Sequence, residues 1–95
     1  MAVVVARTRF SFETFKQRLD ESMARSFAAH VVGKQWVGQT LTIVAPYCRA
    51  SGTYDAGRFS GPIDVGGPAI FLRAAIYADM KRMLRDAGCH DITIL

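Results

Sequence analysis

The chain has 95 residues, of which 51% are hydrophobic and 21% are charged, and it carries a net charge of +4. A chain of this size and composition forms one folded domain with a modest core, which excludes an intrinsically disordered protein. Its 12 basic residues are spread along the sequence and interleaved with acidic ones. No nucleic-acid recognition motif is present, so we favour a solvated surface over a nucleic-acid footprint.

We expect no targeting or membrane-spanning segment in the chain. Residues 1–6 are apolar, but Arg7 and Arg9 follow at once, which is too short for the apolar core of a signal peptide. No apolar run approaches the length of a membrane span. Cys48 and Cys89 are the only cysteines and match no spacing motif, so we expect free thiols, a reducing compartment and a cytoplasmic protein. Whether the two cysteines pair stays open.

A strand followed by a helix is expected at the start of the chain. Residues 2–9 contain three consecutive valines, which favour a strand. Ser11 is a suitable N-cap for a helix over about residues 12–28. The apolar side chains of this helix recur at spacings of three and four: Phe12, Phe15, Leu19, Met23 and Phe27. Such a stripe is usually core, and we expect His30, at the junction that follows, to cap or pack.

Residues 31–66 predict an antiparallel meander, around which the rest of the chain is organised. Period-two alternation of apolar and polar residues indicates strands at about 31–36, 40–45 and 48–55. Gly38 suits the first tight turn because glycine accepts a positive φ. Asp55-Ala56-Gly57 reads as the next hairpin loop.

The fourth strand of the meander begins at Arg58 and ends at Gly66-Gly67-Pro68. Pro62 lacks a backbone N–H, so we expect this strand to lie at a sheet edge or to be interrupted. Ala50 and Gly52 leave room on the apolar face of the preceding strand. We favour close packing of a helix there over a ligand cavity.

A second helix is expected over residues 69–87, with Gly88 as its C-terminal stop. Its apolar stripe comprises Leu72, Ile76, Met80, Met83 and Ala87. Ile70, Phe71 and Tyr77 lie off this stripe and are expected to be partly exposed. Exposed aromatic residues can mark a contact with a partner. Equally well, these residues could pack inside the protein if the helix lies between the sheet and a neighbouring element. For residues 89–95, a short final strand and a loose tail both stay open.

No catalytic constellation is present in the sequence. Cys89, His90 and Asp91 are adjacent, and the side chains of sequence neighbours diverge. Together with Cys48 they match no zinc pattern. The sequence has no paired carboxylates on an apolar background, no phosphate-binding loop and no nucleophile elbow. We therefore expect a non-enzymatic protein with no catalytic residue, cofactor site or metal site.

Two short motifs carry a family resemblance. Residues 36–43 read Trp-x-Gly-x-x-Leu-x-apolar, and residues 50–54 begin as a small-x-Gly strand. An amphipathic helix precedes them, and an apolar strand and a basic amphipathic helix follow. Over about residues 3–87 the chain resembles the small bacterial proteins of the polyhydroxyalkanoic acid system family, also called granule-region proteins. Members of that family run straight from the last strand into the helix, whereas this chain has Gly-Pro breaks at 61–62 and 67–68.

The resemblance implies association with polyester storage granules and supplies no catalytic residue. The second helix would lie on an apolar or lipid-coated surface, with basic residues at its flanks. A second helix that faces the core argues against that arrangement.

We predict a single α+β domain over residues 1–95, with the order β–α–β–β–β–β–α and an optional terminal strand. Two helices pack on one face of a four- or five-stranded, mainly antiparallel sheet. The other face of the sheet is solvated or partly covered by a second subunit, in a homodimer formed through that face or an edge. The residues expected on it are Thr40, Thr42, Arg49, Thr53 and Arg58.

The leading functional hypothesis is a non-catalytic binding or accessory module that contacts a protein, granule or lipid surface. Its contact residues would be Trp36, Tyr54, Phe59 and Tyr77, where these are exposed, together with Arg73, Lys81, Arg82 and Arg85. Two alternatives stay open. One is a basic nucleic-acid-associated protein. The other is a carrier of a small apolar ligand. A cavity lined by Phe15, Leu19, Ala50 and Gly52 would support this alternative.

Overall fold

The computed structural model of the protein describes residues 2–26 and 33–95. Its elements are, in chain order, β1 (Ala2–Thr8), α1 (Phe12–Ser26), β2 (Gly33–Val37), β3 (Thr40–Ala45), β4 (Cys48–Asp55), β5 (Arg58–Val65), the 3-10 helix η1 (Gly67–Leu72), α2 (Arg73–Asp86) and β6 (Cys89–Ile94). Neither α-helix of the described residues is long and apolar enough to span a membrane.

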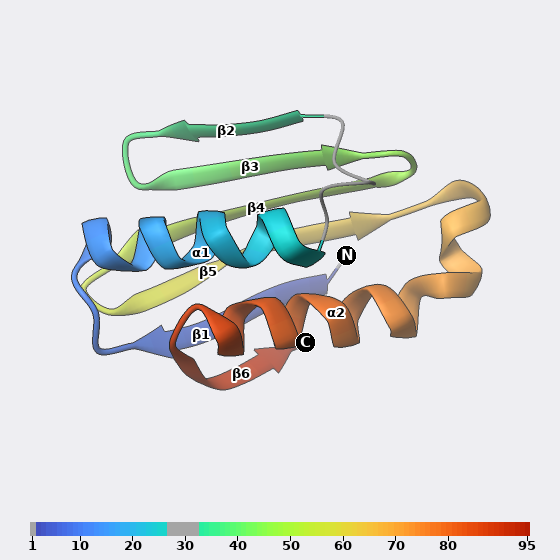
Figure 1. The fold of residues 1–95 in the computed structure, drawn as a ribbon. Helices are drawn as coiled ribbons and strands as arrows, with labels where there is room; N and C mark the ends of the chain where they lie inside the picture. The colour runs from blue at the N-terminus through green and yellow to red at the C-terminus, as the bar shows by residue number, and fades with distance from the viewer. Residues whose placement is uncertain (1, 27–32) are drawn as a thin grey trace.

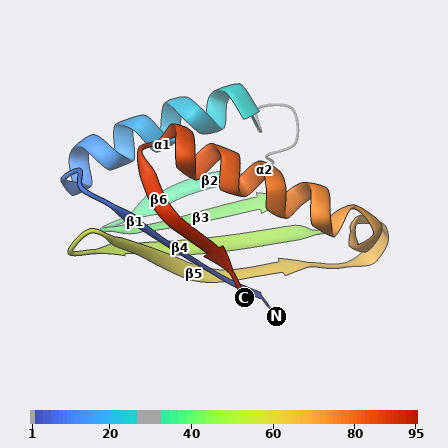
Figure 2. The same cartoon turned by 90° about the horizontal axis from the view of Figure 1, so that it is seen from below.

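The strands form one antiparallel sheet, and the two helices lie together on one of its faces (Figures 1 and 2). This confirms the predicted α+β class. The strand order is β2-β3-β4-β5-β1-β6, so the sheet has 6 strands, more than the four or five expected. The additional strand is β6, which pairs with β1 from Val4 opposite Ile94 to Thr8 opposite Cys89. The end of the chain is therefore a strand and not a loose tail.

Helix α1 begins where its cap predicts. The Thr14 backbone N–H donates to Ser11 Oγ at 3.4 Å, which satisfies one free N–H of the first turn. Phe15, Leu19 and Met23 are buried as expected from their spacing. The predicted end of this helix, with Phe27 and Ala28, and the calls on His30, Val31 and Val32 lie outside the described residues.

Glycine turns connect the strands of the meander at the expected places. Gly38 has a φ of +58° between β2 and β3. Ala56 and Gly57 have φ values of +49° and +85° between β4 and β5, and two consecutive positive φ angles are the signature of a type I′ hairpin turn.

Strand β5, which contains Pro62, lies inside the sheet between β4 and β1. The expectation of an edge strand was therefore wrong. The alternative of an interrupted strand fits, because pairing with β4 runs from Val65 to Ile63 and resumes only at Ser60. At Gly61 a side chain would overlap the carbonyl oxygen of Ser51. Pro62 is tolerated because its missing N–H coincides with this gap in the ladder.

The second helical region begins as the 3-10 helix η1, and the regular helix starts at Arg73, later than the predicted residue 69. Ile70 and Phe71 are exposed as expected, but Leu72, placed in the buried stripe by its spacing, is also exposed. The 3-10 period differs from that of an α-helix, so the predicted stripe does not extend into η1. The remaining stripe is buried at Met80 and Met83. At the other end Gly88, with a φ of +95°, follows the helix as predicted.

The core lies between the helices and the covered face of the sheet. Phe15 of α1 contacts Tyr54 and Phe59, with ring centroids 5.7 and 5.0 Å apart. A side chain at Gly52 would overlap the Phe59 ring, so the room that Gly52 leaves is taken by an aromatic ring and not by a helix.

The uncovered face of the sheet is polar. Thr42, Arg49, Thr53 and Arg58 are exposed there and Thr40 is half-buried. The Thr40 and Thr53 hydroxyls share a hydrogen bond of 2.8 Å across β3 and β4. This agrees with the expected solvated face, and its coverage by a second subunit stays a prediction.

Candidate functional site

Trp36, the first of the predicted contact residues, holds β2 against α1. Its Nε1 donates to Asp20 Oδ1 at 2.9 Å, and its ring meets the ring of Phe12 edge-on at 5.6 Å. Lys34 Nζ lies 3.2 Å from the same Asp20 oxygen. Trp36 therefore has intramolecular partners for both its ring and its N–H.

Tyr54 and Phe59 do not meet the condition of exposure on which their predicted role depended. Both are buried, at 9% and 5% relative exposure. The Tyr54 hydroxyl donates to the carbonyl oxygen of Phe10 at 2.7 Å, so its polar end is also satisfied within the fold. Their place in the strand alternation puts both side chains on the face that the helices cover.

The remaining predicted contact residues lie on α2. Tyr77 is half-buried against the core, and Arg73 is exposed beside it. Lys81 is half-buried, while Arg82 and Arg85 are exposed. Arg82 forms an ion pair with Asp79 one turn earlier.

The apolar side of α2 is buried against the sheet at Met80, Met83 and Leu84. That side cannot lie on an external surface while the protein is folded. This argues against the arrangement in which the second helix lies flat on a granule.

The basic residues do not converge on one face. Arg7 of β1 and Arg58 of β5 are cross-strand neighbours on the uncovered face of the sheet. Arg82 and Arg85 project from α2, which lies on the covered side (Figure 2). The basic residues are thus divided between the two sides of the sheet.

An exposed apolar cluster stands at the end of the molecule where η1 lies (Figure 1). We define the η1 patch as Tyr47, Ile70, Phe71 and Leu72, which are 62%, 47%, 90% and 62% exposed. Three of these residues are consecutive in the chain. A run of consecutive exposed apolar residues is unusual in a soluble protein unless it has a function.

Tyr47 joins the η1 patch from the turn between β3 and β4. Its ring packs against Gly67, where a side chain would overlap it. The Gly66 N–H donates to the Tyr47 carbonyl oxygen at 2.8 Å. These contacts fix the hairpin turn to the start of η1. Sequence reasoning missed Tyr47, although its position after Pro46 in a turn was a usable signal of exposure.

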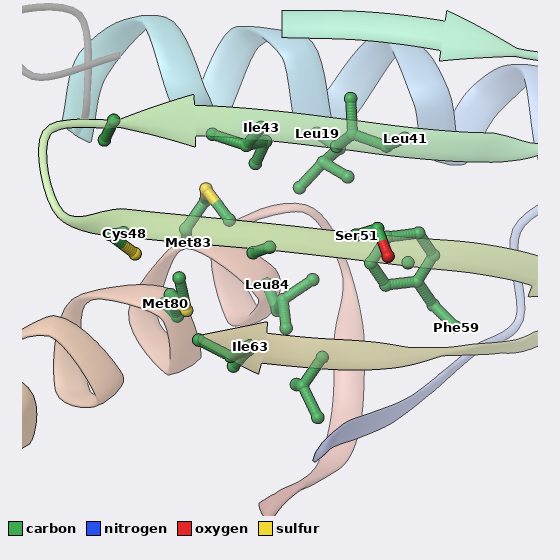
Figure 3. A pocket seen from close by; sticks show the side chains of 14 residues that line it. Leu19, Leu41, Ile43, Cys48, Ser51, Phe59, Ile63, Met80, Met83 and Leu84 are labelled. Carbon is green, nitrogen blue, oxygen red and sulfur yellow. The ribbon is translucent and has the colours of Figure 1, made fainter. Parts of the chain in front are cut away.

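A cavity of about 50 Å³ lies in the core near the η1 patch. Figure 3 shows the side chains around it, which come from the sheet and from both helices. Leu19, Ala50 and Gly52 line it, as the ligand-carrier hypothesis required, whereas Phe15 does not. An open groove of about 480 Å³ lies beside η1 and α2.

Neither cysteine is placed for nucleophilic chemistry. Both are free thiols. Burial raises the pKa of Cys89 to about 12, and burial, with a smaller effect of the nearby Asp64 carboxylate, raises the pKa of Cys48. Both thiols therefore stay protonated at neutral pH, whereas reactive cysteines have a lowered pKa.

The predicted absence of a metal site stays a prediction, because it concerns the whole chain. Within residues 2–26 and 33–95, no group of three or more His, Cys, Asp or Glu side chains gathers. His90 Nδ1 lies 3.1 Å from the Arg7 carbonyl oxygen, which gives this ring a partner within the fold.

No protein-family model matches the chain, and no curated protein or solved structure is significantly similar to it. The resemblance to the polyhydroxyalkanoic acid system family therefore stays a prediction.

Proposed function

We propose that this protein is a non-catalytic binding module that docks onto an apolar surface, lipid-coated or polyester, such as that of a storage granule. The contact is made by the η1 patch. The observation that carries the proposal is Phe71, a phenylalanine that is 90% exposed between two other exposed apolar residues.

The gain from burying the patch is large enough to support docking. Full burial of a Phe, Leu or Ile side chain is worth about 1.5–3 kcal/mol. Phe71 alone therefore supplies about 2 kcal/mol when it enters an apolar surface. Ile70 and Leu72 are already partly covered by the fold and add less each.

The patch is held in place before docking, which lowers the ordering cost of binding. The hydrogen bond from Gly66 to Tyr47 ties its two segments together. Arg73 follows the patch directly and is exposed. The net charge of +4 favours approach to anionic surfaces, where each nearby cation contributes about 1 kcal/mol.

Flotation assays with phospholipid vesicles and with polyhydroxyalkanoate particles test the proposal. Phe71→Ser should weaken binding roughly thirtyfold, which corresponds to about 2 kcal/mol. Parallel assays on the two kinds of particle show whether the surface is lipid or polyester.

The matched control is Val37→Ser. Val37 is 66% exposed at the end of the molecule opposite to η1 (Figure 1), so this change removes an exposed apolar side chain away from the patch. Binding by the Val37 variant should equal that of the parent. Equal binding by the Phe71 variant and the parent, on both surfaces, would remove the η1 patch from the proposal.

A further inference from the structure

The core cavity and the surface groove adjoin each other. The groove is lined by Ala45, Pro46, Cys48, Ala69, Leu72, Ala75, Ile76 and Asp79. Ala45 and Cys48 also line the cavity. The two spaces therefore adjoin each other at the end of the β3–β4 hairpin, beside η1.

The covered face of the sheet is incompletely closed at this end. Ile43, Ala45, Cys48 and Ala50 belong to that face, yet all four are only half-buried. Ile76 of α2, the helix that covers this face, is half-buried as well. Leu41, farther along the same face, and Ile63, the β5 neighbour of Ala50, are fully buried, so the half-buried residues of the face lie on β3 and β4. An apolar occupant in the groove would complete the burial that the described residues leave unfinished.

The dimensions of the cavity select a narrow occupant. Its volume of about 50 Å³ is a third of that of an engineered cavity of about 150 Å³ that binds benzene. A ring therefore does not fit without rebuilding the core. An unbranched chain needs less width, and Met80 and Met83 at the cavity wall have flexible side chains that can adapt to it.

A cavity of about 50 Å³ takes only the end of such a chain. The open groove of about 480 Å³ beside it has room for the rest.

We propose that the cavity and groove bind one unbranched alkyl chain of a single-chain amphiphile. The chain end lies beside Met80 and Met83, and the chain leaves the core past Ala45 and Cys48. This site goes beyond docking by the η1 patch. Leu72 belongs to both the patch and the groove, but Phe71 lines neither space, so Phe71→Ser tests docking alone.

The polar head of the amphiphile stays at the mouth of the groove. Every side chain that lines the cavity is apolar except that of Ser51, which lies on a strand residue that alternates toward the uncovered face. The groove offers one charged residue, Asp79, and Asp79 is paired with Arg82. Recognition therefore rests on the alkyl chain, and a fatty acid and a fatty alcohol of equal length should bind with similar affinity.

Methionine methyl resonances give a direct test. In protein labelled with [methyl-13C]methionine, decanoate is added below its micelle concentration, and decanol is added in a second series. Met80 and Met83 should shift on binding. Met23 is buried but lines neither space, so it serves as the internal control and should not move. Affinity should rise about fourfold for each methylene added between hexanoate and decanoate, because each enters an apolar site.

Two variants locate the site. Ala50→Ile fills the cavity and should reduce decanol affinity at least tenfold. Ala75→Glu places a charge in the groove and should do the same. Its matched control is Ala74→Glu, an exposed neighbour on α2 that does not line the groove. Because Ala75 and Ala74 are both exposed, folding of these two variants does not depend on core packing.

The outcomes separate cleanly. Equal shifts of Met23, Met80 and Met83, affinity independent of chain length, or unchanged binding by Ala75→Glu would each overturn the proposed site. Binding of decanoate but not of decanol would show that the carboxylate is recognised, and would overturn the proposal that the alkyl chain alone is recognised. Phe71→Ser should retain alkyl binding, so loss of surface docking and loss of the alkyl site are distinguishable failures.

Discussion

Gly52 is the position where a single methyl group tests the packing of the core most directly. A side chain there would overlap the ring of Phe59. That ring cannot simply retreat, because the Phe15 ring lies with its centroid 5.0 Å away and both residues are buried. In a close-packed interior such an overlap has to be relieved by moving several neighbours.

The expected cost follows from two opposing effects. Overpacking of a core by a methyl group costs about 1–3 kcal/mol. Replacement of a strand glycine by alanine returns roughly 0.5–1 kcal/mol, because the unfolded chain loses less freedom on folding. We therefore expect Gly52→Ala to lower the free energy of unfolding by about 1–2 kcal/mol. For a domain of 95 residues, this lowers Tm by roughly 5–15 °C.

Urea and thermal unfolding followed by circular dichroism measure both quantities. Gly33→Ala is the matched control, because a side chain at Gly33 meets nothing within 4 Å, and this change should stabilise slightly. In a Phe59→Leu background the ring is gone, so Gly52→Ala should cost close to nothing there, with a coupling of about 1 kcal/mol or more. Two results would refute the reasoning. One is a Gly52→Ala variant that is as stable as the Gly33→Ala variant. The other is a cost of Gly52→Ala that stays the same in the Phe59→Leu background.

Three further changes have defined outcomes. Ser22→Ala removes the hydrogen bond that the buried Ser22 hydroxyl donates to the Met83 carbonyl oxygen at 2.8 Å. Urea unfolding should show that the free energy of unfolding falls by about 1 kcal/mol. An unchanged unfolding midpoint would contradict this prediction. Ala56→Asn should raise the free energy of unfolding by roughly 0.5–1 kcal/mol in the same assay, because asparagine accepts the positive φ before Gly57 better than alanine does. A lower unfolding midpoint would count against this prediction. Burial raises the pKa of Cys89 from 9.0 to about 12. The stability that the protonated thiol contributes is therefore complete below pH 9 and is lost as the pH rises toward 12. The advantage of the parent over Cys89→Ala should therefore shrink across that interval, and a constant difference would disprove it.

The meander could be predicted from the sequence because its signals are local. The alternation in residues 40–45 and 48–55 and the glycines at the turns act within one hairpin at a time. The strand bounds in this region agree closely with the structure. The cap at Ser11 and the stop at Gly88 are local signals of the same kind.

The final strand stayed open because its formation depends on the free edge of β1, which lies more than 80 residues away in the chain. Pro62 suggested an edge because proline cannot donate to a ladder, but the local gap opposite Ser51 lets an interior strand accept it. Leu72 was placed in the core because the helical period was extended into residues that form a 3-10 helix.

Only part of the candidate site could be predicted. Ile70 and Phe71 were recognisable as exposed because they fall off the apolar stripe of the helix. Tyr54 and Phe59 were named as contact residues although their strand alternation puts them on the covered face. The place where the groove and the cavity adjoin depends on how far α2 leaves the sheet uncovered, and no local pattern encodes that distance.

The position of β1 constrains the order in which the sheet can assemble. β1 is the first strand of the chain, but both of its neighbours, β5 and β6, come from the second half. Its two rows of backbone donors and acceptors stay open until those strands arrive, so completion of the sheet waits on contacts of long sequence separation, which form slowly. A nascent or truncated chain that stops before β6 presents a valine-rich edge to other chains, and such an edge promotes aggregation.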